Sequence, residues 1–444
     1  MAKFSFKLII ILVSFFTTAV FSQDKPSATV PLATQDVIDF YSNVMLAEPF
    51  QPADTNSEII STELPQRDNT NNYYTTSEMV DYFSPNWEQR ISKDWQFFSA
   101  PKALGRILVI NFSATSENNS SSLSYRYLAN QNSQNELYEP WSSSKVLAYT
   151  AAVAKVRQMS DGKIGGQSKA GDTPIADLIT SIHSYEPFGS ANGDSNAIAS
   201  YFVNVAGRDR ITALFHDQWL MLANPAIRLR GAYDNKVFEP NDQNWQIKGQ
   251  KIPVEYPTNN VAQLDYQSYR CEHCGLTGNK PMTTLAQAEW LKRLAVHDRD
   301  PLTRQPHLTA EDVQVLFFGT GHSDQNYRHG GMMQGISVML HNALATAIAG
   351  TLPADPKKVL DDATQGQWRV WQKIGWGPSE TRGAGENVLL AHISLPFYQG
   401  GMEFTVAAQT AEPGDGEIYV NYAGIKMQAL LTQSLTELFA INQP

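Results

Sequence analysis

The sequence predicts a three-layer α/β (α+β) sandwich: an antiparallel five-stranded sheet flanked by helices, joined to an all-helical lobe. Three observations predict this fold. Two strand-like segments occur early in the chain, three more occur near its end, and the stretch between them is mostly helical. In such an order the first two and the last three strands can form one sheet, with the helical lobe between them in sequence.

The first two strands are predicted by apolar runs on either side of a turn. Residues 106–112 form an almost continuous apolar run, which is typical of a buried strand. Residues 118–122 are rich in Asn and Ser and predict a turn, so residues 124–128 predict the return strand. Before them, residues 75–98 have helical spacing with candidate caps at Thr76 and Ser77.

The middle of the chain has helical periodicity in most of its segments. Pro174 suits the first turn of one predicted helix, and Gly207 suits the end of another. Residues 225–325 are rich in Asn, Asp, Pro and Gln, and we interpret them as a long insertion or lid within the helical lobe. The predicted helices cover about 142–159, 173–184, 196–206, 211–223, 284–296, 331–349 and 356–364.

The last part of the chain returns to β structure. Strand-like segments at 368–376, 386–397 and 402–410 precede a helix at about 420–440. The predicted organisation is a signal peptide at 1–22, an N-terminal arm at 23–75 and one domain at 76–444. Within that domain we expect an α/β lobe at about 76–140 and 365–444, and a helical lobe at about 141–364.

The N-terminus has the pattern of a secretory signal peptide. Lys3 and Lys7 precede an apolar run at 8–21, and Val20-Phe-Ser22 suits a cleavage site. The run is short for a membrane anchor, and no later segment is long and apolar enough to span a membrane. We therefore expect a secreted or periplasmic protein with no stable membrane span after cleavage.

The charge of the chain argues against nucleic acid as a partner. The 444 residues carry a formal net charge of −10, and removal of the two signal-peptide lysines makes it −12. No basic stripe offsets this acidic balance, so the expected partner is a small molecule or a peptide.

Cys271 and Cys274 are the only two cysteines, in a Cys-x-x-Cys pattern. Two cysteines do not make a disulfide framework. A local disulfide formed after export is the first interpretation. Half of a zinc site with His273, or a redox pair, are the alternatives. We expect no metal and no cofactor.

Ser142 and Lys145 stand three residues apart at the start of a strong predicted helix. Residues at this spacing share one helix face, so Lys145 can reach Ser142 Oγ. A helix N-terminus also offers free N–H groups and partial positive charge. The pair has the S-x-x-K arrangement of a serine nucleophile with a lysine base. The alternative is a serine N-cap followed by a solvated lysine.

A second motif follows in the expected order, on the first strand of the C-terminal trio. That strand carries Lys373, Ile374, Gly375, Trp376 and Gly377. With the S-x-x-K pair, it resembles the serine β-lactamase and D,D-peptidase (penicillin-binding) superfamily. The strand motif is especially similar to that of class D β-lactamases, and the order of the helical lobe is more similar to class A. The resemblance covers about 75–444, without much of 225–325.

The resemblance implies definite roles for the motif residues. Ser142 would be the acylated nucleophile, and Lys145 its general base or part of a base network. Lys373 would lower the pKa of Lys145 and attract a substrate carboxylate. The backbone N–H groups of Ser142 and Trp376 would form the oxyanion hole. Gly375 would let the substrate lie against the strand.

The strand motif departs from the family pattern at one position. The family has Thr or Ser where this chain has Ile374, and that hydroxyl normally binds the substrate carboxylate. Efficient turnover of β-lactams is therefore in doubt. Arg382, just past the strand, can bind a carboxylate instead; the alternative for Arg382 is a surface salt bridge.

The second family motif, S-x-N, has two possible registers. In the first, Ser190 relays a proton to the leaving group and Asn192 binds the substrate amide, with Asn196 four residues beyond. In the second, Asn196 is the motif asparagine and Asp194 or Ser195 borders the site. A flexible loop with an N-cap at Asp194 or Ser195 is the structural alternative.

These observations predict an exported serine hydrolase that acts on an amide or ester through a Ser142 acyl-enzyme. β-Lactamase, D,D-peptidase and esterase activities all remain open. The rival is a non-catalytic member that keeps the fold as a penicillin-binding-like sensor or binding protein. No acidic residue can be assigned as the base for deacylation, although Glu311 and Asp312 lie in a plausible region.

Overall fold

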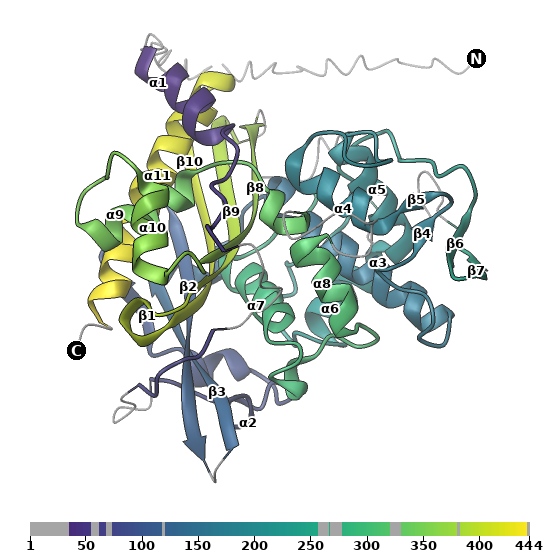
Figure 1. The fold of residues 1–444 in the computed structure, drawn as a ribbon, viewed down its shortest axis with the longest axis horizontal. Helices are drawn as coiled ribbons and strands as arrows, with labels where there is room; N and C mark the ends of the chain where they lie inside the picture. The colour runs from purple at the N-terminus through teal and green to yellow at the C-terminus, as the bar shows by residue number, and fades with distance from the viewer. Residues whose placement is uncertain are drawn as a thin grey trace, which may run out of the picture. The chain divides into compact units, whose positions relative to one another are not determined.

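A six-stranded sheet forms the centre of the protein, with the strand order β1-β3-β2-β10-β9-β8 (Figure 1). This computed structural model describes residues 35–54, 62–67, 73–117, 120–255, 266, 278–319, 330–379 and 382–441. The prediction of an α/β fold in which the first and last strands share one sheet is confirmed, because β2 pairs antiparallel with β10. The strands are β1 (Asp94–Phe98), β2 (Arg106–Glu117), β3 (Ser120–Asn130), β8 (Arg369–Ser379), β9 (Ala384–Leu395) and β10 (Met402–Pro413).

The sheet has one strand more than the five predicted. β1 adds to its edge and runs parallel to β3, whereas the sequence predicted helix over residues 75–98. Only α2 (Ser77–Val80) and a 3-10 turn at Trp87–Ile91 are helical there. Asp81 and Asn86 both have left-handed backbone conformations, with φ of 48° and 57°, which break the helix.

Helices cover both faces of the sheet and make it the middle of three layers. On one face α11 packs against β9 and β10, with α9 and α10 beside it; on the other face α7 packs against β2 and β10 (Figure 1). Alternate side chains of β2 enter the two cores: Leu108 and Ile110 face α7, and Ile107 and Val109 face α11. These helices are α7 (Thr284–Ala295), α9 (Met339–Ala349), α10 (Pro356–Thr364) and α11 (Glu417–Ala440).

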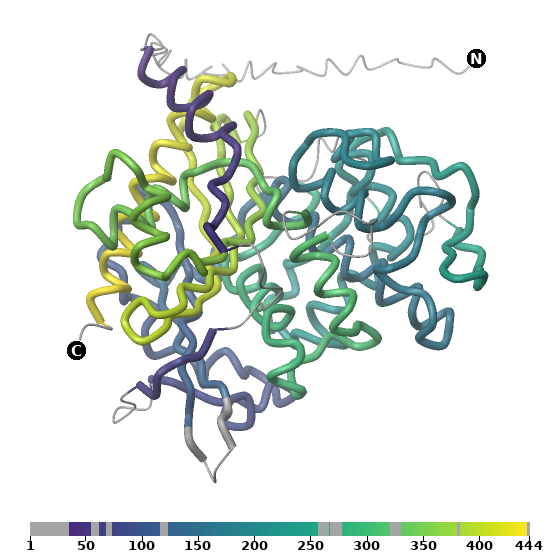
Figure 2. The backbone as a smooth tube through the Cα atoms, in the orientation of Figure 1, coloured from purple at the N-terminus to yellow at the C-terminus, as the bar shows by residue number. Residues whose placement is uncertain are grey.

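Between β3 and β8 the chain builds the helical lobe (Figure 2). A small four-stranded sheet, ordered β5-β4-β6-β7, lies within this part of the chain. The elements are a 3-10 turn at Trp141–Ser144, α3 (Lys145–Met159), β4 (Lys169–Ala170), β5 (Thr173–Pro174), α4 (Ile175–Ser184), α5 (Ser195–Ala206), α6 (Arg208–His216), β6 (Asn244–Ile247), β7 (Gln250–Pro253), α8 (Ala310–Phe318) and a 3-10 turn at Gly331–Gln334.

Two predicted helices are shorter than expected. The one predicted over 211–223 ends at His216, and the one predicted over 331–349 begins at Met339 after a separate 3-10 turn. The predicted insertion at 225–325 also contributes to the core of the sheet, because α7 packs on it. The other short elements are α1 (Gln35–Phe40), a π-helix at Tyr41–Met45 and 3-10 turns at Ser133–Asn135, Pro301–Thr303 and Tyr398–Gly400.

Some expectations concern residues outside those described. The signal peptide at 1–22 and the Cys271–Cys274 pair are among them. Within the described residues, no helix combines the length and apolar character needed to cross a membrane.

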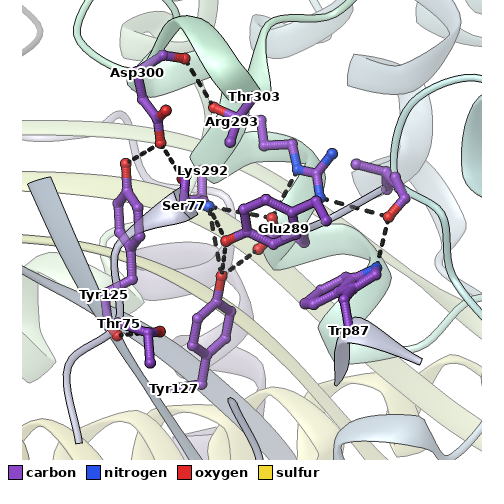
Figure 3. A network of polar contacts seen from close by, with 12 residues as sticks. Thr75, Ser77, Trp87, Tyr125, Tyr127, Glu289, Lys292, Arg293, Asp300 and Thr303 are labelled. Atoms are coloured by element: carbon purple, nitrogen blue, oxygen red, sulfur yellow. Dashed lines mark hydrogen bonds and ion pairs between the residues drawn. The ribbon is translucent and has the colours of Figure 1, made fainter. Parts of the chain in front are cut away.

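A buried network of charged and tyrosine side chains fixes α7 to the sheet (Figure 3). Glu289 Oε1 accepts hydrogen bonds from Arg293 Nε at 2.7 Å and from Lys292 Nζ at 3.2 Å. Tyr127 of β3 donates to Glu289 Oε2 at 2.8 Å. At the end of the network Asp300 accepts from Tyr125 at 2.7 Å. Glu289 thus pairs with both buried cations, and Asp300 is held by hydroxyl groups of Tyr125 and Ser77, so α7 is fixed against the sheet.

Replacing Glu289 with glutamine is expected to lower the free energy of unfolding by about 3–5 kcal/mol, because it leaves two buried cations without a counter-ion. Burial raises the pKa of Glu289, but Lys292 and Arg293 oppose it and the net direction is down. The stabilisation is therefore present above the ordinary glutamate pKa and is lost as pH falls below it.

Urea denaturation at pH 7 measures this effect. The matched control is Asp362→Asn, which breaks a solvent-exposed pair with Lys358 and should leave the free energy of unfolding almost unchanged. Equal losses in the two variants would contradict the structural role assigned to Glu289.

Candidate active site

Ser142 lies in a tight turn just before α3. Trp141 precedes it with a left-handed backbone (φ 49°), an uncommon conformation for a residue with a side chain. The neighbouring serines hold the turn in place: Ser143 Oγ donates to the Pro140 carbonyl at 2.6 Å, and Gln287 Nε2 of α7 donates to Ser143 Oγ at 2.7 Å. Ser142 itself is half-buried, so its hydroxyl stays accessible.

Lys145, the first residue of α3, is fully buried beside this turn. Its Nζ donates to Ser195 Oγ at 2.8 Å and to Asn196 Oδ1 at 2.7 Å, both at the start of α5. Burial and then the nearby charge of Lys280 lower the pKa of Lys145 to about 7. A lysine with this pKa is neutral in a large fraction of molecules at neutral pH and can accept a proton.

Strand β8 lies directly against the Ser142 turn because two of its residues are glycines. A Cβ atom at Gly375 would lie 2.4 Å from Ser142 N, and one at Gly377 would lie 2.4 Å from a Trp141 ring carbon. The strand motif therefore lies beside the S-x-x-K pair, although Lys145 and Lys373 are 228 residues apart in the sequence.

Gly375→Ala is expected to lower the rate of any reaction at Ser142 by about 10²-fold or more, because the new methyl group displaces the Ser142 N–H. Steady-state kinetics with an activated ester such as p-nitrophenyl acetate measure it. The control is Gly249→Ala in the turn between β6 and β7, where a Cβ meets no atom within 4 Å and the left-handed backbone (φ 78°) makes the substitution strained, so it tests whether backbone strain elsewhere lowers the rate. An active Gly375→Ala protein would show that β8 and the turn are not in contact during the reaction.

Lys373 projects from β8 into the same site. It is buried, and within the described part of the chain its Nζ has no hydrogen-bond partner. The Nζ atom stands 3.7 Å from the centre of the Tyr185 ring. Burial and the charge of Lys145 hold its pKa well below the usual range. The site therefore holds a buried amine whose charged form no described carboxylate stabilises.

Tyr185 joins the parts of this site, although no motif in the sequence indicated it. It ends α4 in a left-handed conformation (φ 61°), which turns the side chain toward β8. Its hydroxyl donates to the Ile374 carbonyl at 2.9 Å and is hydrogen-bonded to Ser142. The ring lies 5.3 Å from Lys145 Nζ, so it faces both lysines.

The Tyr185 hydrogen bond shows which backbone groups of β8 face away from β9. The N–H and C=O groups of one residue point to the same side of a strand, and that side alternates along the chain. Tyr185 binds the Ile374 carbonyl, so Ile374 and Trp376 both present these groups at the free edge. Trp376 N–H thus points to the side where Ser142 lies, as the oxyanion-hole assignment requires.

The structure does not bring Ser190 and Asn192 to Lys145. The Ser190 hydroxyl donates to Asp177 Oδ2 at 3.1 Å, and Asn192 Oδ1 accepts from the backbone N–H of Asp194 at 3.0 Å. Ser190 and Asn192 lie in the loop before α5, which the Ser190 contact with Asp177 ties to α4. The residues that do reach Lys145 are Ser195 and Asn196, as in the second register of the S-x-N motif.

Two residues expected to bind substrate have other contacts. The Ile374 side chain is buried in the core between the sheet and α11, on the opposite face of β8 from Lys373. Arg382 forms a two-pronged ion pair with Glu386, with Nε–Oε1 at 2.8 Å and Nη2–Oε2 at 2.6 Å. This is the salt bridge that the sequence left as the alternative for Arg382.

Asp312 and Glu311 lie far from Ser142. Asp312 caps α8 and pairs with Arg157. Arg157 is 12 residues after Lys145 on α3, which corresponds to about 18 Å along the helix. Glu311 is largely exposed and is also near Arg157. Neither carboxylate is in reach of a group bound at Ser142.

Comparison with known proteins finds similarity in fold only. No protein-family profile matches the chain, and no curated protein matches it. A β-lactamase from Streptosporangium roseum is 13% identical, with a TM-score of 0.35, over 76% of this chain and 95% of that one. A class A β-lactamase from Bacteroides cellulosilyticus DSM 14838 is 11% identical, with a TM-score of 0.37, over 75% and 92%. A PBP-A mutant in an acyl-enzyme complex with penicillin G is 11% identical, with a TM-score of 0.37, over 85% and 99%.

These solved structures belong to the superfamily that the two motifs resemble. Their identities of 11–13% and TM-scores below 0.5 carry no argument about activity. What this chain does is therefore argued from its own side chains.

Proposed function

We propose that this chain is an exported serine hydrolase of the β-lactamase and D,D-peptidase type, acting on an amide or ester through an acyl-enzyme on Ser142. One observation carries the proposal. Lys145 is buried, and its pKa is lowered to about 7. It lies one helical turn from Ser142, whose backbone contacts the edge strand β8 at Gly375. The apolar N-terminal run supports export through a cleaved signal peptide.

In the proposed acylation step, neutral Lys145 takes the proton from Ser142 Oγ as that oxygen attacks the substrate carbonyl carbon. The oxyanion that forms accepts hydrogen bonds from the N–H groups of Ser142 and Trp376. Collapse of the intermediate breaks the bond to the leaving group, which receives the proton held by Lys145. Water then attacks the acyl ester, and Ser142 recovers its proton.

Ser195 and Asn196 support the second register of the S-x-N motif in this mechanism. Both side chains bind Lys145 Nζ in the free protein. Ser195 would pass the proton from Lys145 toward the leaving group. Asn196 would hold the amine in position, since an amide oxygen accepts from it in either protonation state.

The substrate class follows from Lys373 and the free edge of β8. A buried lysine without a described partner favours a substrate that brings a carboxylate. The backbone groups of Ile374 and Trp376 at the edge can pair with an extended substrate once the Tyr185 hydroxyl is displaced. Arg382 contributes less at Ser142, because its ion pair with Glu386 holds it at a separate cavity that Lys145 and Lys373 do not line.

The reaction at Ser142 is expected to speed up as pH rises through about 7 and then to level off, because Lys145 acts as a base only when neutral. Lys280→Gln removes a charge that lowers this pKa, so the midpoint should move to higher pH. A pH profile of kcat/KM measures both effects. A profile that does not change in the variant would contradict the electrostatic role of Lys280.

Two covalent probes test the proposed function and its alternatives. A fluorescent penicillin and a fluorophosphonate are each incubated with the wild type and Ser142→Ala. Labelling of the wild type by both, with none in the variant, is expected for a β-lactamase or D,D-peptidase. Labelling by the fluorophosphonate alone indicates an esterase. Absence of any Ser142-dependent adduct would favour the non-catalytic binding protein.

A further inference from the structure

A cavity lies at one end of the main sheet, next to the Ser142 turn. Its volume is about 370 Å³, within the range of small-molecule sites. Three cations line it, namely Lys102, Arg106 and Arg382, together with the carboxylate of Glu386. Glu136 pairs with Lys102 and Arg106 from beside the cavity, so one positive charge remains in excess, whereas the whole chain carries a net charge of −10.

Two arginines in the cavity keep a donor group available. Arg106 donates hydrogen bonds from Nε to Glu136 and from Nη1 to Gln409. Its Nη2 therefore has no hydrogen bond to a described residue. Arg382 donates from Nε and Nη2 to Glu386, so its Nη1 likewise has no hydrogen bond to a described residue. The fixed planes of their guanidinium groups suit an oxyanion, to which charge-assisted hydrogen bonds are strong.

The cavity is separate from the site around Ser142 but shares a wall with its turn. Glu386 accepts from Trp141 Nε1 at 2.7 Å on one side and from Arg382 on the other. Lys145 and Lys373 do not line the cavity. Leu104 and Leu137 are among the residues that give the lining an apolar part, so an anion that also carries a small apolar group fits the cavity.

We propose that this cavity binds a small molecule bearing a carboxylate or phosphate group, held by Arg106 and Arg382. Arg106 and Lys102 are partly exposed, with side chains 28% and 49% accessible, and form the entrance. Arg382 and Glu386 are nearly buried and form the floor. An anion that enters replaces water at the free guanidinium nitrogens and needs no change in the ion pairs.

Isothermal titration at constant ionic strength tests the proposal, using the full chain after signal-peptide removal. Inorganic phosphate and succinate are titrated separately, and the tighter of the two identifies the anion class. We expect saturable binding at one site per chain. Arg106→Gln should weaken it about tenfold or more, because it removes a charged hydrogen bond. Lys358→Gln, an equal charge change on a distant exposed lysine, should not.

Two further variants keep the test independent of folding and of catalysis. Lys102→Gln should weaken binding less than Arg106→Gln and removes only an exposed side chain. Lys373→Met removes the amine expected to attract a carboxylate at the active site and should bind as the wild type does, because Lys373 does not line this cavity. The proposal is overturned if neither anion binds saturably, if Arg106→Gln binds equally well, or if Lys373→Met abolishes binding, which would put the anion at the active site.

Discussion

Lys145→Met is expected to lower kcat/KM for an activated ester by about 10³-fold, because the variant has no base to take the proton from Ser142. Lys145 Nζ is the only group that the structure shows bound to both Ser195 and Asn196 within the described residues. Methionine is of similar size and needs no hydrogen bond, so the turn around Ser142 should keep its shape.

Stability measurements separate this catalytic effect from a structural one. Burial lowers the pKa of Lys145 to about 7, so charging the lysine opposes folding at every pH below its ordinary pKa. Lys145→Met should therefore be as stable as the wild type or more stable at pH 7. A variant that loses activity and also unfolds at lower denaturant concentration would show that Lys145 acts mainly as a structural residue.

Ser142→Ala is expected to reduce hydrolysis of the same ester by about 10⁴-fold or more, since no other residue replaces a missing nucleophile. The substrate should still bind, because the Ser142 backbone N–H and β8 are unchanged. The measurement is kcat/KM together with the dissociation constant of an unreactive substrate analogue.

Ser190→Ala is the matched control for that substitution. The Ser190 hydroxyl contacts Asp177, so its loss should change kcat/KM by only a few-fold. A loss comparable to that of Ser142→Ala would restore the first register of the S-x-N motif and contradict the roles proposed for Ser195 and Asn196.

The sequence predicted the parts of the site that follow from strong local patterns. The serine-lysine pair needs only helical spacing, and the Lys373-to-Gly377 motif lies on a strand that apolar residues mark clearly. The reason for the glycines became visible only in the structure: Gly375 and Gly377 allow β8 to contact the Ser142 turn.

Long-range contacts of ordinary residues were beyond sequence reasoning. Tyr185 and Lys280 belong to no motif, and they act because the fold brings them to Ser142 and Lys145. The S-x-N register was ambiguous because Ser190 and Asn192 match the letters of the motif whereas Asn196 opens the next helix, and only the contacts of Lys145 favour one register. The sequence alone allows Arg382 either to bind a substrate carboxylate or to form a salt bridge, and the structure shows its ion pair with Glu386.

β1 was missed for a related reason. Its sequence, with Trp95, Phe97 and Phe98, suits a strand, but the helical spacing over 75–98 competed with it. Left-handed residues at Asp81 and Asn86 end the helix early, and single-sequence patterns do not reveal such conformations.

The most direct test of the central claim is to find which residue reacts. The wild-type protein is treated with a fluorophosphonate, and the adduct is mapped by peptide mass spectrometry. We expect one adduct per chain, on Ser142, whose rate of formation rises as pH passes through about 7 and then levels off. An adduct on another residue, or none on folded protein, would contradict the assignment of Ser142 as a nucleophile activated by Lys145.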